Sequence, residues 1–426
     1  MSDNVDTWLW LTMVMKPNNP RLGKILAECG FNAAKAGVII RDGREPSLTA
    51  GEISRAKAIR LGTVREFSAF CEKSGVSIIS YESENYPEQL RKIENPPAVL
   101  FVLGNAEGLN SAPLLTVVGT RNVSEYGLAV TNYLVKPLAK AGAVIVSGMA
   151  LGTDKAVHNA CLEAGGRTLA FPGCGVLETH PAENAELKAK IIESGGAVIS
   201  ELLPNEKASS WYFKRRDAVM AGISHAALVI EAGERSGSLV TAECAKQQGK
   251  TVFAVPPRDI ISGNFSGNAA LIRSGAVSVF DFSDIASVLE KTSKSADFAE
   301  KLRNPANFAV NEEKKREQVP EKQKVPEKQA VLQKQKAPKK RAVSKEKQIE
   351  ELPAEQNPAK ALDESALSEL SDAQKLIVKA LAESPENAES VMEKLGLEYS
   401  VAIEALILLE VNGFIERGND GVYRVK

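Results

Sequence analysis

The sequence predicts an α/β protein built on a doubly wound parallel sheet. The intervals between successive apolar segments run about 20–30 residues, the length of a crossover helix with its loops. The segments are apolar throughout rather than alternating, so we expect helices to cover both faces of the sheet. The six segments are Leu114–Val118, Ala143–Val146, Arg167–Phe171, Gly196–Ile199, Ala226–Ile230 and Thr251–Val255.

The chain has 426 residues, of which 44% are hydrophobic and 25% charged, and its formal net charge is −1. These values are ordinary for a soluble globular protein, and the length predicts two or three domains. The cysteines are scattered and form no CxxC pair, which argues against a zinc or redox pair and favours free thiols in a reducing cytosol. They are Cys29, Cys71, Cys161, Cys174 and Cys244.

Residues 1–85 are predicted to form a domain of short helices. Its first apolar stretch, near the N-terminus, follows acidic residues and is shorter than the ~20 residues of a membrane span, so we expect a helix in a cytoplasmic protein without a membrane partner. Leu22, Ile25 and Leu26 form a stripe at helical spacing that ends at Gly30. A second amphipathic stretch covers Ala50–Phe70.

A strand at Val76–Ser80 precedes the α/β domain, which we place at residues 86–290 and which includes an apolar run from Ala98 to Leu103. Residues 291–360 are rich in Lys, Gln, Glu and Pro and hold too few large apolar residues for a core, so they are predicted to be a flexible linker. This linker has 18 basic and 11 acidic residues, a balance of +7. A basic tether that adds affinity for nucleic acid is an alternative interpretation.

Residues 361–426 are predicted to form a winged-helix domain. Three helices, at Ala373–Ala382, Ala388–Leu395 and Ser400–Asn412, precede a hairpin that turns at Asn419–Gly421. The domain has 6 basic and 13 acidic residues, a balance of −7. Duplex DNA would be repelled, which favours a contact with protein.

Small or glycine-rich loops follow four of the predicted strands, where ligands of such folds bind. Glycines let backbone N–H groups approach a phosphate, and a helix N-terminus adds partial positive charge. The loops together predict a phosphate-binding ledge, although any single one would be explained as a tight turn. The loop residues predicted to bind are Gly119, Thr120, Ser147, Gly148, Gly152, Ser236, Gly237 and Ser238.

Basic and aromatic side chains lie beside these loops. Arg121 belongs to the first loop and Lys155 to the second. Trp211–Arg216 is the densest basic and aromatic cluster before the linker, a combination that suits single-stranded DNA because bases stack and the backbone takes the charged contacts. We predict binding roles for Phe213, Lys214, Arg215 and Arg216, and we expect Trp211 to lie in the core.

No GxGxxG or GxxxxGK[ST] motif occurs, so no nucleotide cofactor is expected. Asp154 and His158 lie four residues apart and share one face of a helix. A metal or catalytic pair is one interpretation, and a structural hydrogen bond at a helix start is the other. Since no further ligand or nucleophile stands nearby, we favour the structural role and predict no metal.

Several of these motifs, in this order, resemble the DNA-processing protein A family (DprA or Smf). They are Gly119-Thr-Arg121 with Ser124-x-Tyr-Gly127, SGMALGTDKAVH, Phe213-x-Arg-Arg216, SGSLVTAECAKQQGKTVFAVP, and Ser266-Gly-Asn268 with Leu271-Ile-x-x-Gly-Ala276. The resemblance covers nearly the whole chain except the linker. It implies an extended Rossmann-like domain between an N-terminal sterile-alpha-motif-like or helix-hairpin-helix-like domain and a C-terminal winged helix.

The resemblance also implies a homodimer that binds single-stranded DNA and loads the recombinase RecA onto incoming DNA in natural transformation, without catalysis or a cofactor. Arg121 and Lys214–Arg216 would contact phosphates. The chain departs from the family's usual pattern at Asp217 and Ala218, which replace Asn and Arg, and at Lys214, which replaces Pro. Thr153 likewise stands where the family usually has Ile.

Two rival functions remain at this point. The segment Glu231–Glu243 is similar in outline to the PGGxGTxxE loop of nucleoside-monophosphate phosphoribohydrolases of the lysine-decarboxylase-like family. In that case Glu243 would be the acid or base. A pure interaction scaffold is the other rival, and it predicts that neutralising Arg121 leaves DNA affinity unchanged.

Overall fold

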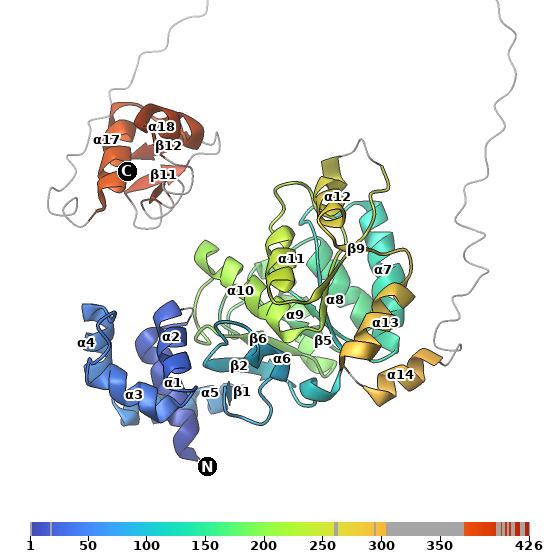
Figure 1. The fold of residues 1–426 in the computed structure, drawn as a ribbon, viewed down its shortest axis with the longest axis horizontal. Coiled ribbons are helices and arrows are strands. Elements are labelled where there is room, and N and C mark those ends of the chain that lie inside the picture. The colour runs from blue at the N-terminus through green and yellow to red at the C-terminus, as the bar shows by residue number, and fades with distance from the viewer. Residues whose placement is uncertain are drawn as a thin grey trace, which may run out of the picture. The chain divides into compact units, whose positions relative to one another are not determined.

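The computed structural model describes residues 2–303 except 18, 260–262 and 294, and residues 370–425 except 398–401, 403–404, 407–408, 410–413 and 418–421. The chain forms two compact units, Met1–Gln323 and Lys324–Lys426. In Figure 1 the first unit runs from blue to orange and the second is red. No helix in the described ranges is long and apolar enough to cross a membrane.

The first unit begins with short helices, as the sequence predicts. The apolar stripe of α2 is buried, and the side chain of Asn19 caps the start of that helix. The stretch from Ala50 is split into two helices because Ile59 and Arg60 have extended backbone. The helices are α1 (Ser2–Met15), α2 (Pro20–Glu28), α3 (Ala33–Arg41), α4 (Ala50–Ala58) and α5 (Leu61–Lys73).

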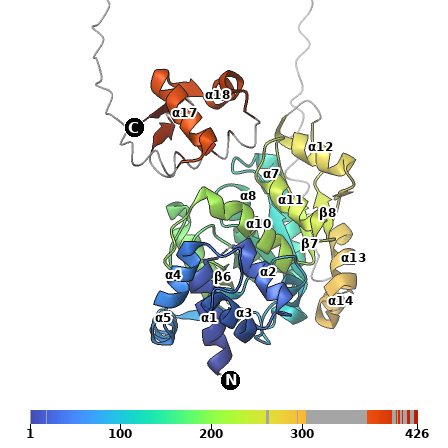
Figure 2. The same cartoon turned by 60° about the vertical axis from the view of Figure 1, so that its left-hand side comes forward.

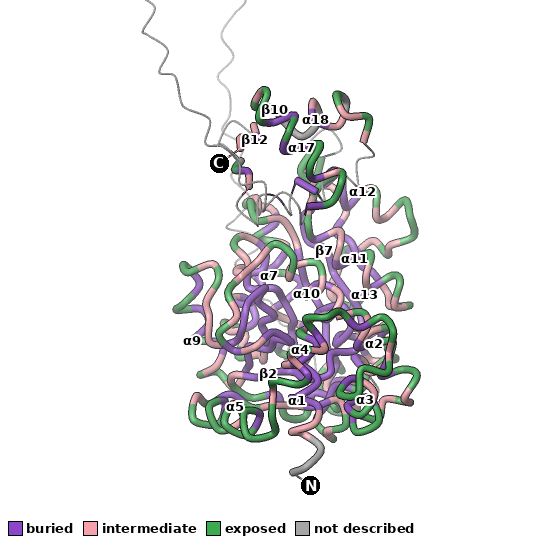
Figure 3. Tube along the Cα trace, turned by 90° about the vertical axis from the view of Figure 1, so that its left-hand side faces the viewer, coloured by how far each residue is buried: buried purple, intermediate pink, exposed green. Residues whose placement is uncertain are grey.

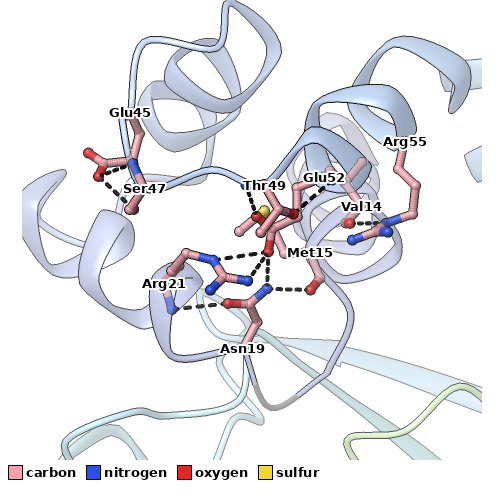
Figure 4. A network of polar contacts seen from close by, with 9 residues as sticks. All are labelled: Val14, Met15, Asn19, Arg21, Glu45, Ser47, Thr49, Glu52 and Arg55. Carbon is pink, nitrogen blue, oxygen red and sulfur yellow. Dashed lines mark hydrogen bonds and ion pairs between the residues drawn. The ribbon is translucent and has the colours of Figure 1, made fainter. Parts of the chain in front are cut away.

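The buried carboxylate of Glu52 joins these helices (Figure 4). It accepts hydrogen bonds from the Arg21 guanidinium at 2.6 and 3.1 Å, the Asn19 amide at 2.6 Å and the backbone N–H of Thr49 at 2.7 Å. Burial raises the pKa of Glu52, but these hydrogen bonds, that from Arg21 foremost, outweigh burial and lower it to about 2. One ionised side chain therefore ties the turn between α1 and α2 to the start of α4.

The sheet has nine strands in the order β1-β2-β6-β5-β4-β3-β7-β8-β9. All six strands predicted from apolar segments are present, and β3 to β9 pair in parallel. The expectation of a wholly parallel sheet is wrong at one edge, where β2 runs antiparallel to both β1 and β6. Residues 81–98 connect β1 to β2 and include the four-residue helix α6 (Glu88–Arg91), which is far shorter than a usual crossover helix, and the two strands pair directly with each other in antiparallel register.

The strands are β1 (Val76–Ser80), β2 (Val99–Gly104), β3 (Leu114–Val118), β4 (Val144–Ser147), β5 (Thr168–Ala170), β6 (Ala197–Ser200), β7 (Ala226–Val229), β8 (Thr251–Ala254) and β9 (Val277–Ser278). The helices that follow them are α7 (Glu125–Lys140), α8 (Thr153–Glu163), α9 (Ala185–Glu193), α10 (Ser210–Ile223), α11 (Ser238–Gln247), α12 (Ser266–Arg273), α13 (Phe282–Ser293) and α14 (Ala296–Arg303). Short 3₁₀ turns lie at Leu109–Ser111, Ala182–Asn184 and Gly263–Phe265.

The helices cover both faces of the sheet, as Figure 2 shows for α10 and α11 with α7 and α8. Residues of α10, α11 and α6 form one core cluster with the strands, and residues of α7, α8 and α13 form another. A further cluster joins the N-terminal helices to β2, β5 and β6, so packing is continuous across residue 85. Buried residues concentrate along the strands, whereas the outer turns of α3 and α5 are exposed (Figure 3).

The predicted start of the linker at residue 291 is too early. The helix α13 continues to Ser293, and α14 extends the folded unit to Arg303. The reason is Phe298, which is 1% exposed and packs into the core beside α7 and α13. The rest of the predicted linker lies outside the described residues.

The second unit contains α17 (Asp372–Glu383), β10 (Glu386–Asn387), α18 (Ala388–Leu395), β11 (Ile415–Arg417) and β12 (Val422–Val425). The first two predicted helices and both hairpin strands are present, and β10 adds a third strand in the order β10-β12-β11. Ile377, Leu381 and Ile415 belong to its core. The predicted helix at Ser400–Asn412 falls largely, and the turn at Asn419–Gly421 entirely, outside the described residues.

Candidate functional site

A pocket of about 400 Å³ opens at the carboxyl edge of the sheet, where the sequence places the ledge. Its walls come from the loop after β3, the start of α8, the helix α10 and the loop between β7 and α11. The lining residues are Val118, Gly119, Thr120, Arg121, Ala150, Asp154, Phe213, Arg216, Asp217, Met220, Gly233, Arg235, Ser236, Gly237, Ser238 and Thr241.

The loop after β3 is held against the start of α8. The backbone N–H and the hydroxyl of Thr153 both donate to the carbonyl of Thr120, each at 3.0 Å. A Cβ on Gly119 would lie 2.5 Å from the Thr153 hydroxyl oxygen. Gly152 has a φ of +75° and packs against the carbonyl of Arg121, so a side chain there would be strained as well as blocked. These glycines fix the loop that presents Arg121.

The loop from Ala232 to Gly237 is held from below by Asn268. The Asn268 amide donates to the carbonyls of Val229, Ile230 and Val255 at 2.9–3.1 Å and accepts from the Ala232 N–H at 2.7 Å. This accounts for Ser266-Gly-Asn268, a motif to which the sequence alone assigns no role. Because every polar atom of the amide is engaged, the loop has one defined position beneath the pocket.

The buried carboxylate of Glu231 joins this loop to the first one. It accepts from the backbone N–H of Ser124 at 2.9 Å and from the Ser124 hydroxyl at 2.8 Å. The Glu231 carbonyl in turn accepts from the N–H of Thr120 at 2.7 Å. The Oε2 atom and the backbone carbonyl of Glu231 therefore hold the pocket wall together.

Phe213 of α10 lies between two guanidinium groups. The Cζ atom of Arg121 is 5.8 Å and that of Arg216 is 5.4 Å from the centre of the Phe213 ring. Such cation–π contacts orient the cations while the ring covers apolar surface. Gly173 makes room for the ring, since a Cβ there would lie 2.6 Å from it.

Arg216 is largely buried and engaged with the protein itself. Its Nη1 donates to the carbonyls of Gly148 and Phe171 at 2.7 and 2.5 Å, and its Nε donates to the Asp217 carboxylate at 2.9 Å. The sequence predicts Arg216 as a phosphate contact, and the structure places it in the pocket wall with most of its donors in use. Arg121 is exposed, so the first loop presents this cation to solvent.

Two carboxyl groups share the guanidinium of Arg216. Burial raises the pKa of Asp217 to about 6, with Arg216 opposing that rise and Asp154 adding to it. Burial likewise raises the pKa of Asp154, against the effect of Arg216. Among the lining residues three arginines face these two acids, so Asp217 reduces the positive charge of a pocket that is otherwise suited to an anion.

Eight of the fourteen predicted site residues line the pocket, namely Gly119, Thr120, Arg121, Phe213, Arg216, Ser236, Gly237 and Ser238. Ser147, Gly148 and Gly152 lie just behind it: the Ser147 hydroxyl donates to the Val117 carbonyl at 2.7 Å, and the Gly148 carbonyl accepts from Arg216. The structure does not bring Lys155, Lys214 and Arg215 into the pocket. Lys155 lies near Glu186, and Lys214 lies toward Cys244 on α11.

Arg215 points to a different side of α10 from Arg216. Its guanidinium forms a buried ion pair with Glu201 at 2.8 Å and donates to the carbonyl of Asn95 at 2.7 Å. Burial alone would lower the pKa of Arg215, but the Glu201 carboxylate reverses this and raises it. The structure thus gives this side chain a packing partner within the protein.

Two expectations are wrong. Trp211 is 66% exposed, because it stands in the first turn of α10 where the helix projects beyond the sheet. Asp154 and His158 do not pair: the His158 Nδ1 meets the Thr168 hydroxyl at 2.7 Å, and Asp154 accepts from the N–H of Ala150 at 3.2 Å. Burial lowers the pKa of His158 to about 3, so the ring is neutral and structural.

Sequence reasoning missed Arg235, Asp154 and Asp217 as lining residues. Arg235 stands in a loop that was identified, and its position directly before the predicted binding residues Ser236–Ser238 was the available signal. Glu243, the rival acid or base, is exposed on α11, accepts from Gln247 at 3.0 Å and does not line the pocket. Among the described residues no group of three His, Cys, Asp or Glu side chains is arranged to hold a metal.

Comparison with known proteins gives one consistent result. The family described as DNA recombination-mediator protein A matches residues 77–290. The chain is 37% identical over 221 residues to DNA processing protein DprA of Bacillus subtilis, covering 52% of this chain and 73% of that protein. It is 36% identical over 242 residues to Protein Smf of Escherichia coli, covering 57% and 64%. A structure of DprA from Streptococcus pneumoniae matches with a TM-score of 0.58 at 30% identity, over 67% of this chain and 98% of that one.

Proposed function

The chain belongs to the DNA recombination-mediator protein A family, and on this premise we propose that it binds single-stranded DNA at the carboxyl edge of its sheet and mediates recombination without catalysis. The observation that carries the proposal is Phe213 between Arg121 and Arg216 at the mouth of a pocket with glycine-rich walls. Backbone N–H groups and an exposed arginine suit phosphates, and aromatic rings beside cations suit exposed bases.

Within this proposal the pocket residues have different binding roles. Arg121 and Arg235, both exposed, contact phosphates, and Gly119 and Gly237 bring backbone N–H groups close to the DNA strand. The Ser236 N–H donates to the Gly233 carbonyl at 3.1 Å and holds the loop instead. Arg216 positions Phe213 and neutralises Asp217 rather than reaching far into solvent. Trp211, exposed at the start of α10, is available as a further stacking surface.

We further propose that the protein acts as a homodimer that loads RecA onto incoming DNA in bacterial natural transformation. Residues 361–426 act as an acidic winged helix that contacts protein rather than DNA, consistent with their balance of −7. Deletion of residues 361–426 is expected to leave DNA binding intact. Loss of DNA binding on this deletion, with the dimer preserved, would contradict the proposal that residues 361–426 contact protein rather than DNA.

The direct test is the binding of a fluorescent ~30-nucleotide oligo(dT) at low and physiological salt to the parent, Arg121→Ala and Arg303→Ala. Arg303 is an exposed cation on α14 that does not line the pocket, and it serves as the charge-matched control. Arg121→Ala is expected to weaken binding about tenfold and to lower the magnitude of the salt slope by about 0.7, the value for one phosphate contact on a single strand. Equal affinities for Arg121→Ala and Arg303→Ala would refute the site.

The mediator role has its own test. RecA filament assembly on an oligonucleotide already coated with single-strand-binding protein should be faster with the parent than with Arg121→Ala. The hydrolase alternative predicts release of ribose 5-phosphate from AMP. The position of Glu243 outside the pocket does not favour it, and such release would overturn the proposed function.

A further inference from the structure

A second basic surface lies in the N-terminal helices, separate from the sheet edge. An open groove of about 640 Å³ is lined by Arg41 at the end of α3, Lys57 and Arg60 at the junction of α4 and α5, and Arg65 on α5. One carboxylate, that of Asp6, also lines it. Four cations against one acid give the groove a formal charge of +3. We call these five residues and the space between them the N-terminal basic groove.

Contacts between α1 and the neighbouring helices hold the walls of the N-terminal basic groove in place. The indole N–H of Trp10 donates to the carbonyl of Ile59 at 2.9 Å, which ties α1 to the junction between α4 and α5. The guanidinium of Arg41 lies 5.0 Å from the centre of the Trp10 ring. A cation held against a ring loses less side-chain entropy when it binds an anion.

The junction itself offers donors to an anion. Ile59 is extended, so α4 ends and α5 starts anew at Leu61, and the N-cap residue Arg60 provides no side-chain cap. The first backbone N–H groups of a helix have no partner within the helix, and they add partial positive charge at its start. Lys57 and Arg60 are exposed here and, within the described ranges, form no ion pair.

Among the residues that the structure describes, no carboxylate pairs with Lys57 or Arg60, whereas Arg65 meets Asp6 at 3.3 Å. A surface that gathers like charges around a shallow groove costs repulsion energy unless an anion neutralises it. The groove is open rather than enclosed, which argues against a small drug-like ligand, whereas an extended polyanion needs only spaced cations and helix-end N–H groups.

We propose that the N-terminal basic groove binds the phosphate backbone of a nucleic-acid strand, independently of sequence and independently of the Arg121 pocket. Two of its four cations, Lys57 and Arg60, supply the strongest contacts because neither has an internal partner in the described structure. Arg41 and Arg65 supply the flanking contacts. The groove thus serves as a second anchoring point on the same unit as the pocket.

The test compares the full chain with Lys57→Ala/Arg60→Ala and with Lys35→Ala/Lys73→Ala. The second pair removes the same charge from exposed positions of α3 and α5 that do not line the groove. The probe is fluorescent ~30-nucleotide oligo(dT). Loss of two phosphate contacts is expected to weaken binding about tenfold or more near 0.1 M salt and to lower the magnitude of the salt slope by about 1.4, whereas the control pair should have little effect. Unchanged melting of both variants, followed by tryptophan fluorescence, establishes that the fold is intact.

The same assay on Arg121→Ala separates this inference from the proposed function. If Lys57→Ala/Arg60→Ala weakens binding and Arg121→Ala does not, the groove stands and the pocket proposal fails. If only Arg121→Ala weakens binding, the groove proposal is overturned. It is also overturned if Lys57→Ala/Arg60→Ala and the control Lys35→Ala/Lys73→Ala weaken DNA binding equally. A third contradicting outcome is that Lys57→Ala/Arg60→Ala reduces binding to phosphatidylserine vesicles while DNA affinity stays the same, because the ligand would then be a membrane surface.

Discussion

Asp217 is the pocket residue whose replacement should change both stability and ligand affinity. Its carboxyl group is 12% exposed and receives the Nε–H of Arg216 at 2.9 Å. Burial and the neighbouring Asp154 raise its pKa from about 3.8 to about 6 although Arg216 acts in the other direction. The folded protein therefore holds a proton on Asp217 at pH values where the unfolded chain has lost it.

The sign of the effect follows from linkage. An acid with a raised pKa in the folded state destabilises the fold as pH rises from its unfolded pKa through its folded pKa, and the cost stays constant above that range. A pKa of about 6 in the folded protein against about 3.8 in the unfolded chain corresponds to roughly 3 kcal/mol at pH 8 and to about 1.6 kcal/mol at pH 5. Asp217→Asn removes this cost and keeps an oxygen that can accept from Arg216.

We therefore expect Asp217→Asn to be more stable than the parent, and its advantage should be larger at pH 8 than at pH 5 by about 1.4 kcal/mol. Urea unfolding followed by tryptophan fluorescence is a suitable assay, because Trp8, Trp10 and Trp211 all belong to the first unit. Glu243→Gln is the matched control, since it removes an exposed carboxylate on the next helix. An advantage that does not grow with pH, or that equals the control's, would refute the reasoning.

Two other substitutions test two further ion pairs that hold a buried carboxylate, and Asp217→Asn is also expected to change DNA affinity. Glu52→Gln should lower the free energy of unfolding by up to roughly 3 kcal/mol at pH 7, because the pKa of Glu52 is lowered to about 2 in the folded protein. This stabilisation is present above about pH 4.5 and disappears as pH falls toward 2. Urea unfolding at pH 3 and pH 7 measures the difference. Arg215→Ala should lower the free energy of unfolding by about 3–5 kcal/mol, because it leaves Glu201 buried without its partner. Lys214→Ala should change it by less than about 0.5 kcal/mol. Similar values for the two variants would contradict the different roles assigned to these residues. At pH 8 Asp217→Asn should bind oligo(dT) several-fold more tightly than the parent, measured by fluorescence anisotropy, since one negative charge leaves the pocket wall.

The six parallel strands could be predicted from the sequence because apolar runs of that length and spacing are a local property of the chain. The same applies to the glycine-rich loops: once the strands are parallel, their carboxyl ends meet at one edge, and Gly119, Arg121 and Ser236–Ser238 must come together there. The antiparallel edge at β1 and β2 was not predicted, because strand direction depends on pairing partners distant in the sequence.

The roles of the cluster on α10 depended on tertiary structure. Lys214, Arg215 and Arg216 look equivalent in sequence, but consecutive residues of a helix point about 100° apart. Lys214 is consequently exposed, Arg215 turns inward to Glu201, and Arg216 turns to the pocket wall. Composition and periodicity determined that a basic edge exists on this protein, whereas the rotation of one helix against the sheet decided which of its cations can face a ligand.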